Sequence, residues 1–595
     1  LVAFAVAALA GCAVPPPDSY VSGGKKDVAG LALGKNATGE ACTQQQSGDG
    51  AADVYCGTWQ QPSARVRSAG PAGADALIGL ATASAWRQGL NDRYNCGTPS
   101  RSSILGGEPA VLMNCTQRLG GWPHVAMVAT VGGSAWYADG VLPALPVMER
   151  AIGVLSGRVR AEAASQSQTS AADAQLASRL AAQAFSSGDV GAYEQLMKEA
   201  ARANQAENFA GAEDAYRAAL ALQQKALGPN DPNTVSTLLN LALQISNQGR
   251  WSEADALFAR ADQLAAGAAD GTQQARLLHY EALHALNQGK RTEALALLDR
   301  AEPAYAALLP PEVLKARPVQ LARGTINRLG SGGPADMLGN RNLLTDVSTR
   351  SALMGLIEVR RYRAIVLRGL DRPAESEQAL ASARTLAAAN GLSQPVLRAR
   401  MDRTAAAIDA AGGDPTKAAA AYGAAVSAFS NALPDSRPVA ETELLRAGQL
   451  LQSGQAGPAL AVCQRGVGLL RQLKIGTEAT LLDPCLDVFA QAAQARSKAG
   501  DKAGEQALLV QMFEASQLSQ GGVTSQQIAQ ATARLSENAR DPRVAEAVRA
   551  RQDATNKLAD LYRERDRLDQ QRNPGGAAAP EGPAPESAAL DKRIT

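Results

Sequence analysis

Residues 248–254, with the sequence QGRWSEA, recur as QGKRTEA at residues 288–294, 40 positions further along the chain. A related stretch, AENFAGA, occupies residues 206–212. The same slot recurs later in the chain, and the residues at its centre are Gly249, Gly289, Asp371, Gly413, Gly454 and Gly500. Their spacing stays at about 41 residues if the step from 289 to 371 counts as two units. This period predicts a helical solenoid in which each repeat is one pair of helices.

Each repeat has the same expected construction. A first helix ends at the Gly or Asp of the slot, where a left-handed or capping conformation closes it. The second helix starts directly afterwards, and small side chains such as Ala254 and Ala294 let the two helices approach closely. One such pair buries too little apolar surface alone, so we expect stacked neighbours to supply the hydrophobic core.

The most specific sequence of the array, ALQQKALGPNDPNTVSTLLNLA, lies at residues 221–242. It resembles the kinesin-light-chain subtype of the tetratricopeptide repeat (TPR), whose units are about 42 residues long. Pro229 and Pro232 lie in the turn between two repeats, where they end one helix and start the next. The resemblance implies a mainly α, right-handed TPR-type solenoid over residues 158–540. Residues 330–342, GSGGPADMLGNRN, are expected to interrupt it as a loop.

The composition of the whole chain agrees with a helical protein. The 595 residues include 59 basic and 57 acidic side chains, so the net charge is close to zero and nucleic-acid binding is not expected. Aromatic residues make up only 4%, while the helix formers Ala, Leu, Gln, Glu and Arg are abundant. An all-β architecture is excluded on this basis.

Residues 30–157 differ from the array because Tyr, Trp, Gly, Pro and Cys are concentrated there. The segments HVAMVATV at 124–131 and SAWYA at 134–138 flank a Gly-Gly pair, a pattern that predicts a β-hairpin. Residues 110–115 are a further strand candidate, and residues 75–89 and 143–155 are expected to be helical. This part is therefore predicted to be a small α+β domain that precedes the solenoid.

Cysteine counting indicates export. The chain has seven cysteines, and six of them remain after Cys12 is set aside: Cys42, Cys56, Cys96, Cys115, Cys463 and Cys485. An even number in an oxidising compartment suggests disulfides. The four front cysteines allow three connectivities, of which the sequence-local one, 42 with 56 and 96 with 115, is favoured. Buried free thiols are the alternative.

The first residues carry an export pattern. The apolar run LVAFAVAALA at residues 1–10 leads into Gly11 and Cys12, and the run is too short to span a bilayer. Leu9-Ala10-Gly11-Cys12 resembles the lipobox of bacterial lipoproteins, which implies a signal peptide at residues 1–12, a lipidated Cys12 and a tether at 13–29. Because Ala13 follows the cysteine, the resemblance further implies the periplasmic face of the outer membrane. A plain secretory segment is the alternative, and the chain looks cut at its front.

The last segment has a heptad pattern. Steps of three and four alternate from Val544 to Leu568 along a seam that is apolar except at Arg551 and Arg565, which predicts a coiled-coil-like helix at residues 541–572. A Pro/Ala-rich linker and the start of another helix at 573–595 suggest that more sequence follows. Residues 511–544 are similar to the segment that joins repeats to the catalytic module in CHAT proteins, which are caspase-like peptidases fused to TPRs. In such a protein Cys463 and Cys485 would suit a bridge within the last repeats. The catalytic His and Cys of that family would lie beyond Thr595.

Few residues suggest chemistry. His279 and His284 are five positions apart on an expected helix, which argues against a shared metal site. Zinc, P-loop and hydrolase motifs are absent from the sequence, so we expect no metal, no cofactor and no catalytic residue. A front cysteine assisted by His124 is the sharpest enzymatic alternative. The tryptophans of the front domain are expected in its core rather than in a ligand site, and they are Trp59, Trp86, Trp122 and Trp136.

The expected function follows from the solenoid. Stacked helix pairs form a concave face that offers many side chains to a segment of a protein partner. We therefore expect a lipid-anchored, periplasm-facing scaffold for protein–protein interaction. The alternative is the partner-sensing part of a CHAT-type peptidase, and a third possibility is an enzyme based on the front domain.

Overall fold

The computed structural model describes residues 30–58, 61–160, 170, 185–268, 270–315, 347–392 and 394–520, and isolated positions between 546 and 564. Several expectations fall outside these residues: the lipobox and Cys12, the tether at 13–29, Trp59, the loop at 330–342, and the linker at 573–595. The heptad segment at 541–572 is described at five positions only, of which Leu561 is buried.

Two compact units make up the chain. The first comprises Leu1–Ala81, Pro99–Leu112 and Val125–Ala181, and the second comprises Thr82–Thr98, Met113–His124 and Ala182–Thr595. Within the described parts of the chain, every helix is too short or too polar to span a bilayer.

The front region contains a nine-stranded antiparallel sheet. Its strands are β1 (Leu31–Lys35), β2 (Ala41–Gly48), β3 (Ala51–Cys56), β4 (Ala64–Pro71), β5 (Tyr94–Cys96), β6 (Ser100–Ile104), β7 (Glu108–Gln117), β8 (Pro123–Val131) and β9 (Ser134–Val141). They are arranged in the order β1-β2-β3-β4-β9-β8-β7-β5, and β6 also pairs with β7. The expected hairpin is present as β8 and β9, joined by Gly132 and Gly133, which both have positive φ.

Three helices accompany the sheet: α1 (Leu77–Ala83), α2 (Ala85–Asn91) and α3 (Leu145–Leu155). The stretch expected to be helical, residues 75–89, is divided into short helices, because Ser84 ends α1 and caps α2 by accepting a hydrogen bond from the amide of Arg87 at 3.1 Å. The buried residues of α3 pack against β1, β3, β4 and β9.

Three disulfides cross-link neighbouring elements. Cys42 and Cys56 are register partners on β2 and β3, and Cys96 and Cys115 are register partners on β5 and β7. Cys463 is joined to Cys485 in the last part of the chain, across 22 residues. Each bridge therefore links segments that are already adjacent in the fold.

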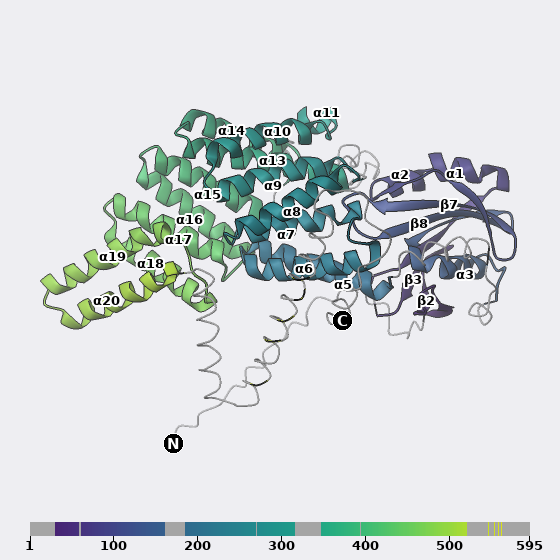
Figure 1. Cartoon of the computed structure of the whole chain (residues 1–595), viewed down its shortest axis with the longest axis horizontal. Coiled ribbons are helices and arrows are strands. Elements are labelled where there is room, and N and C mark those ends of the chain that lie inside the picture. The colour runs from purple at the N-terminus through teal and green to yellow at the C-terminus, as the bar shows by residue number, and fades with distance from the viewer. Residues whose placement is uncertain are drawn as a thin grey trace, which may run out of the picture. The chain divides into compact units, whose positions relative to one another are not determined.

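The rest of the described chain forms seven antiparallel helix pairs, which follow one another in colour order in Figure 1. The pairs are α5 (Ser187–Gln205) with α6 (Phe209–Leu227), α7 (Val235–Ser246) with α8 (Trp251–Ala265), α9 (Thr272–Asn287) with α10 (Arg291–Ala306), α13 (Val347–Gly369) with α14 (Pro373–Ala389), α15 (Pro395–Ala411) with α16 (Pro415–Ala432), α17 (Arg437–Gln452) with α18 (Ala456–Leu473), and α19 (Ala479–Lys498) with α20 (Lys502–Gln517). A short helix, α11 (Pro311–Lys315), follows α10.

The turn within each pair has one residue in the left-handed region. The six slot residues Gly249, Gly289, Asp371, Gly413, Gly454 and Gly500 all have positive φ, between 58° and 79°. In the first pair the equivalent residue is Glu207, with φ 56°. Asx caps and prolines then start the next helix: Asp414, for example, accepts from the amide of Lys417 at 2.9 Å, and Pro415 follows directly.

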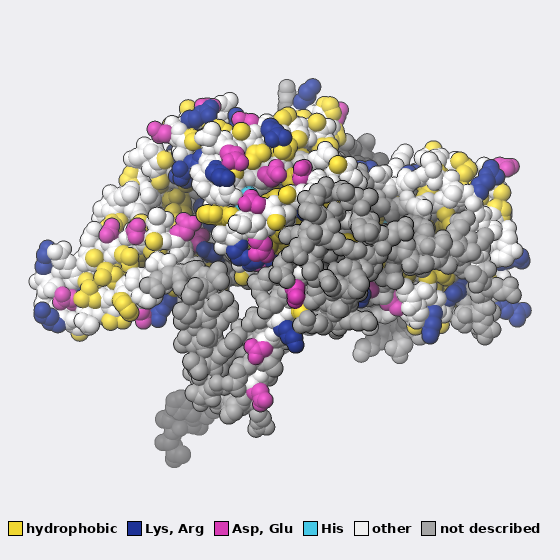
Figure 2. All heavy atoms as spheres, viewed as in Figure 1, with side chains coloured by type: hydrophobic (Ala, Val, Ile, Leu, Met, Phe, Trp, Pro, Cys, Tyr) yellow, Lys and Arg dark blue, Asp and Glu magenta, His cyan; other side chains and the backbone are white. Residues whose placement is uncertain are grey.

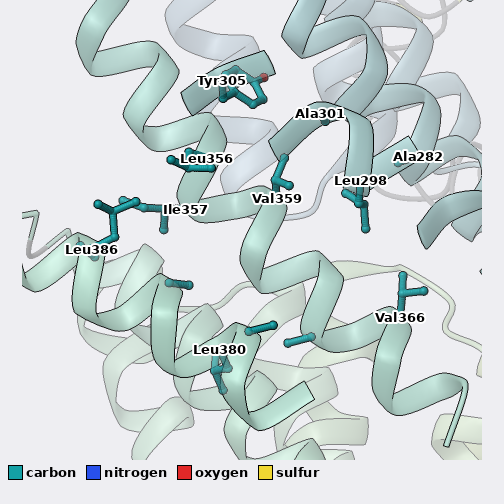
Figure 3. Close-up of a cluster of buried hydrophobic side chains, with 14 of the residues drawn as sticks. Ala282, Leu298, Ala301, Tyr305, Leu356, Ile357, Val359, Val366, Leu380 and Leu386 are labelled. Atoms are coloured by element: carbon teal, nitrogen blue, oxygen red, sulfur yellow. The ribbon is translucent and has the colours of Figure 1, made fainter. Parts of the chain in front are cut away.

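The core is distributed along the array rather than gathered at one centre. A cluster of buried side chains joins α9, α10, α13, α14 and α15, and Figure 3 shows part of it around Leu298, Tyr305, Leu356 and Leu380. Separate clusters of buried hydrophobic side chains form the core of the earlier and of the later repeats. This continuity across pair boundaries is the physical reason that the repeats stack.

The last helix, α20, has an apolar face that the described residues leave open. Leu509, Val510 and Phe513 are exposed there, Phe513 by 65%, whereas Leu508 and Ala515 on the other side are buried. Apolar side chains are also visible at this end of the array in Figure 2. In each preceding pair the second helix packs against the first helix of the next pair.

Candidate functional site

Packing between repeats gives the array an inner side. The first helices of neighbouring pairs contact each other, as in α7 with α9, α9 with α13, and α13 with α15. Each second helix packs instead between the first helix of its own pair and that of the next. The array therefore bends toward its first helices, and we call the surface that they form the inner face.

A ladder of polar contacts runs along the inner face. Arg276 donates to the Ser236 hydroxyl at 2.7 Å, Tyr280 donates to Asn240 Oδ1 at 3.2 Å, and Asn287 donates to Asn247 Oδ1 at 2.9 Å. Each of these bonds joins residues 40 positions apart. Arg276 extends the ladder by donating to the Ser351 hydroxyl, also at 2.7 Å. Equivalent positions of α7 and α9 thus meet, and Arg276 continues this polar surface to α13.

His279 lies beside this ladder in an aromatic environment. Its ring is 5.4 Å from that of Tyr280, 6.0 Å from Tyr362 and 6.1 Å from Tyr305. The side chain is only 4% exposed, and neither ring nitrogen has a hydrogen-bond partner among the described residues. Burial therefore lowers the pKa of His279 to about 4, and Arg361 and Arg276 act in the same direction, while Glu358 opposes them.

We expect acid to destabilise the array through His279. The folded-state pKa lies below the ordinary value of about 6.5, so the neutral ring stabilises the fold above that pH, and this stabilisation is lost as the pH falls toward 4. Between pH 7 and 4.5 the free energy of unfolding should fall by about 2 kcal/mol through this group. Urea denaturation of the wild type and of His279→Phe at both pH values measures the difference. An equal pH dependence in the two proteins would contradict the assignment.

Buried charged pairs also hold the array together. Arg361 on α13 donates to Glu358 at 2.5 Å and stacks on the Tyr362 ring, 4.1 Å from its centroid. Although burial raises the pKa of Glu358, Arg361 and Arg400 lower it overall, so the carboxylate stays ionised. A second network joins the first two pairs, where Glu213 accepts from both Arg217 and Arg250 at 2.7 Å.

Contacts also join pairs that are distant in sequence. Arg403 on α15 donates to Glu207 at 2.8 Å, and the two residues are 196 positions apart. The guanidinium of Arg437 on α17 lies 5.5 Å from the ring centroid of Phe209 and donates to Glu441 at 2.7 Å. The bend of the array therefore brings the first turn against the fifth and sixth pairs.

His284 takes part in an arrangement of Ser, His and Asp. Its Nδ1 is 2.8 Å from Ser246 Oγ, and its Nε2 is 2.9 Å from Asp255 Oδ1. Ser246 is 1% exposed, and its oxygen also accepts a hydrogen bond from Asn287 at 2.9 Å, so the hydroxyl is not available to a substrate. The three side chains instead tie α7, α8 and α9 together, apart from the surroundings of His279.

The front region does not form the cysteine–histidine arrangement considered above. All four front cysteines are in disulfides, and His124 stacks on Tyr94 with centroids 4.1 Å apart. Trp86, Trp122 and Trp136 are buried, as expected for core residues. Among the described residues, no group of three or more His, Cys, Asp or Glu side chains could hold a metal ion.

Part of the front region belongs to the same compact unit as the array. Trp122 packs against Phe185 and Tyr193, with centroids 4.8 and 5.8 Å apart. Gln273 of α9 donates to the carbonyl of Leu119 at 2.9 Å. Residues 113–124 therefore rest on the first helices of the array.

Sequence reasoning did not identify the residues of the inner face. A signal was present at one position, because Asn247 recurs as Asn287 40 positions later, whereas Arg276 and Tyr280 replace Ser236 and Asn240 of the preceding repeat. The slot residues, which the sequence did single out, lie in the turns at the ends of the helices.

These features define a helical-repeat protein with an amino-terminal antiparallel sheet. No protein-family model and no curated protein sequence matches the chain. Solved structures do match, among them BtubC (BKLC) from P. vanneervenii, at 12% identity and a TM-score of 0.29 over 47% of this chain and 92% of that chain.

Two further solved structures also match the chain. Aspartyl phosphate phosphatase F from Bacillus subtilis is 12% identical, with a TM-score of 0.30 over 59% of this chain and 89% of that chain. A Rap protein complexed with competence and sporulation factor is 11% identical, with a TM-score of 0.23 over 56% of this chain and 100% of that chain. All three TM-scores lie below 0.5.

Proposed function

We propose that this chain is an exported scaffold that binds a protein partner along the inner face of its helical array. The observation that carries the proposal is the ladder of bonds between residues 40 positions apart. Together with the bond from Arg276 to Ser351, it joins α7, α9 and α13 into one polar surface, and an extended surface of this kind suits a segment of another protein better than a small substrate.

The compartment is part of the same proposal. Three disulfides indicate an oxidising environment, such as the periplasm or the extracellular space. A lipid on Cys12, attachment to the outer membrane and the right-handed sense of a TPR superhelix are finer elements of the proposal and rest on the sequence resemblances. The CHAT alternative rests on sequence alone, and most of its segment lies outside the described residues.

Site-specific photo-crosslinking in intact cells tests the proposal. A benzophenone amino acid is placed at Asn287, an exposed position of the ladder on α9, or at Ala296, an exposed position on the second helix α10. The expected result is an adduct of one defined mass from position 287 and none from position 296. Labelling from both positions alike, or from position 296 alone, would count against the inner face as the binding surface.

A further inference from the structure

Two turns of the array depart from the rule that the other five turns follow. Five of the seven helix pairs have glycine in the left-handed slot, where a side chain is unfavourable. Glu207 and Asp371 are the two exceptions, with φ 56° and 58°. Asp371 is exposed and makes no side-chain hydrogen bond among the described residues, whereas Glu207 has a specific partner. A residue in a strained conformation is a reason to look for a function.

The partner of Glu207 belongs to a group of arginines. Its carboxylate accepts from Arg403 at 2.8 Å, and Arg400 and Arg437 also act on it electrostatically. Burial raises the pKa of Glu207, but the three arginines together lower it overall, so the carboxylate is ionised.

Only two of these three arginines make an ion pair among the described residues, and Arg400 acts on Glu207 and Glu358 through space alone. Arg437 bonds to Glu441, and Arg403 bonds to Glu207, but Arg400 has no ion-pair partner in the parts of the chain that the structure describes. The side chains of Arg403 and Arg437 each remain 24% exposed, so they can be reached from solvent. A group of neighbouring guanidinium side chains can bind a carboxylate through charge-assisted hydrogen bonds.

We propose that Arg400, Arg403 and Arg437 form a carboxylate-binding site, that Glu207 occupies it as an internal ligand, and that an acidic segment of the protein partner displaces Glu207. The inference rests on the proposed function, and it adds that the partner segment bound by the inner face is acidic. Displacement frees the first turn from α15, so partner binding and release of this contact are one event.

The test compares three variants of the full chain. Glu207→Gly places in this turn the residue that the equivalent turns use, and Glu207→Gln removes the charge while the side chain keeps its size. Asp371→Gly is the matched control, because it makes the same backbone change in a turn whose side chain has no partner. The probe is a fluorescein-labelled hexaglutamate peptide, and its binding is followed by fluorescence anisotropy at low salt.

The expected result is that Glu207→Gly binds the peptide at least tenfold more tightly than the wild type and Glu207→Gln follows the same direction. Asp371→Gly should behave as the wild type, and adding Arg403→Gln to Glu207→Gly should remove the gain. Equal binding by the wild type and Glu207→Gly, a gain in Asp371→Gly, or a gain that survives Arg403→Gln would overturn the inference. Absence of binding by every variant would also overturn it, while the crosslinking experiment would still decide the proposed function separately.

Discussion

Replacing Arg361 with Met should lower the free energy of unfolding by about 3–5 kcal/mol, because it leaves the Glu358 carboxylate without its close partner in a buried site. Arg361 is only 4% exposed and lies 2.5 Å from Glu358. Met fills a similar volume, so the loss comes from the charge and its hydrogen bonds rather than from a cavity. Urea denaturation followed by circular dichroism measures the effect.

The chain contains a matched control for this substitution. Arg372 and Glu375 form an ion pair of the same i, i+3 spacing at 2.6 Å, but both side chains are exposed. Arg372→Met should therefore change stability little, because solvent already screens that pair. A second check is Arg361→Met combined with Glu358→Leu, which should recover most of the loss since the carboxylate that Arg361→Met leaves unpaired is removed as well. Equal effects of Arg361→Met and Arg372→Met would refute the argument from burial.

The sequence predicted the repeats because they depend on local chemistry. A residue with positive φ is needed wherever two antiparallel helices are joined by so short a turn, and glycine at that position recurs visibly at about 41 residues. The hairpin of β8 and β9 was predictable for the same reason, since Gly132 and Gly133 supply the turn that its strands need.

The first strands of the sheet were not predicted, because their sequences lack a strong strand pattern. β2 contains Gln44, Gln45 and Gln46, which have no marked preference for strands, and its pairing with β1 and β3 fixes its conformation. Pairing with the neighbouring strands therefore determines the extended conformation of β2, which its local sequence does not predict.

The inner face was missed for a different physical reason. The contact of Glu207 with Arg403 depends on how far the array bends over four pair boundaries, and small rotations at each boundary add up to that bend. Sequence periodicity gives the length of a repeat but not this rotation. Asn287 could have been proposed from its recurrence 40 positions after Asn247, whereas the Glu207–Arg403 pair could not.

Tyr305 should be as important to stability as the Arg361–Glu358 ion pair, because its ring fills the interface between α10 and α13. It is 1% exposed on α10, and Figure 3 shows it close to α13, near Leu356. Gly355 of α13 faces the ring so closely that a Cβ atom there would lie 2.4 Å from ring carbons. The close approach of α10 and α13 therefore depends on the large ring of Tyr305 and on the absence of a side chain at Gly355.

Tyr305→Ala is expected to lower the free energy of unfolding by about 3–5 kcal/mol, since it leaves a cavity that rigid helices cannot close. Gly355→Ala should also destabilise the protein, although alanine favours helices, because the buried ring cannot move away. Gly457→Ala on α18 is the control: its Cβ meets nothing within 4 Å, so helix propensity alone should stabilise the protein slightly. Urea denaturation of the three variants measures the differences in the free energy of unfolding. If Gly355→Ala stabilises the protein, the contact between Gly355 and the Tyr305 ring is not as tight as this packing requires.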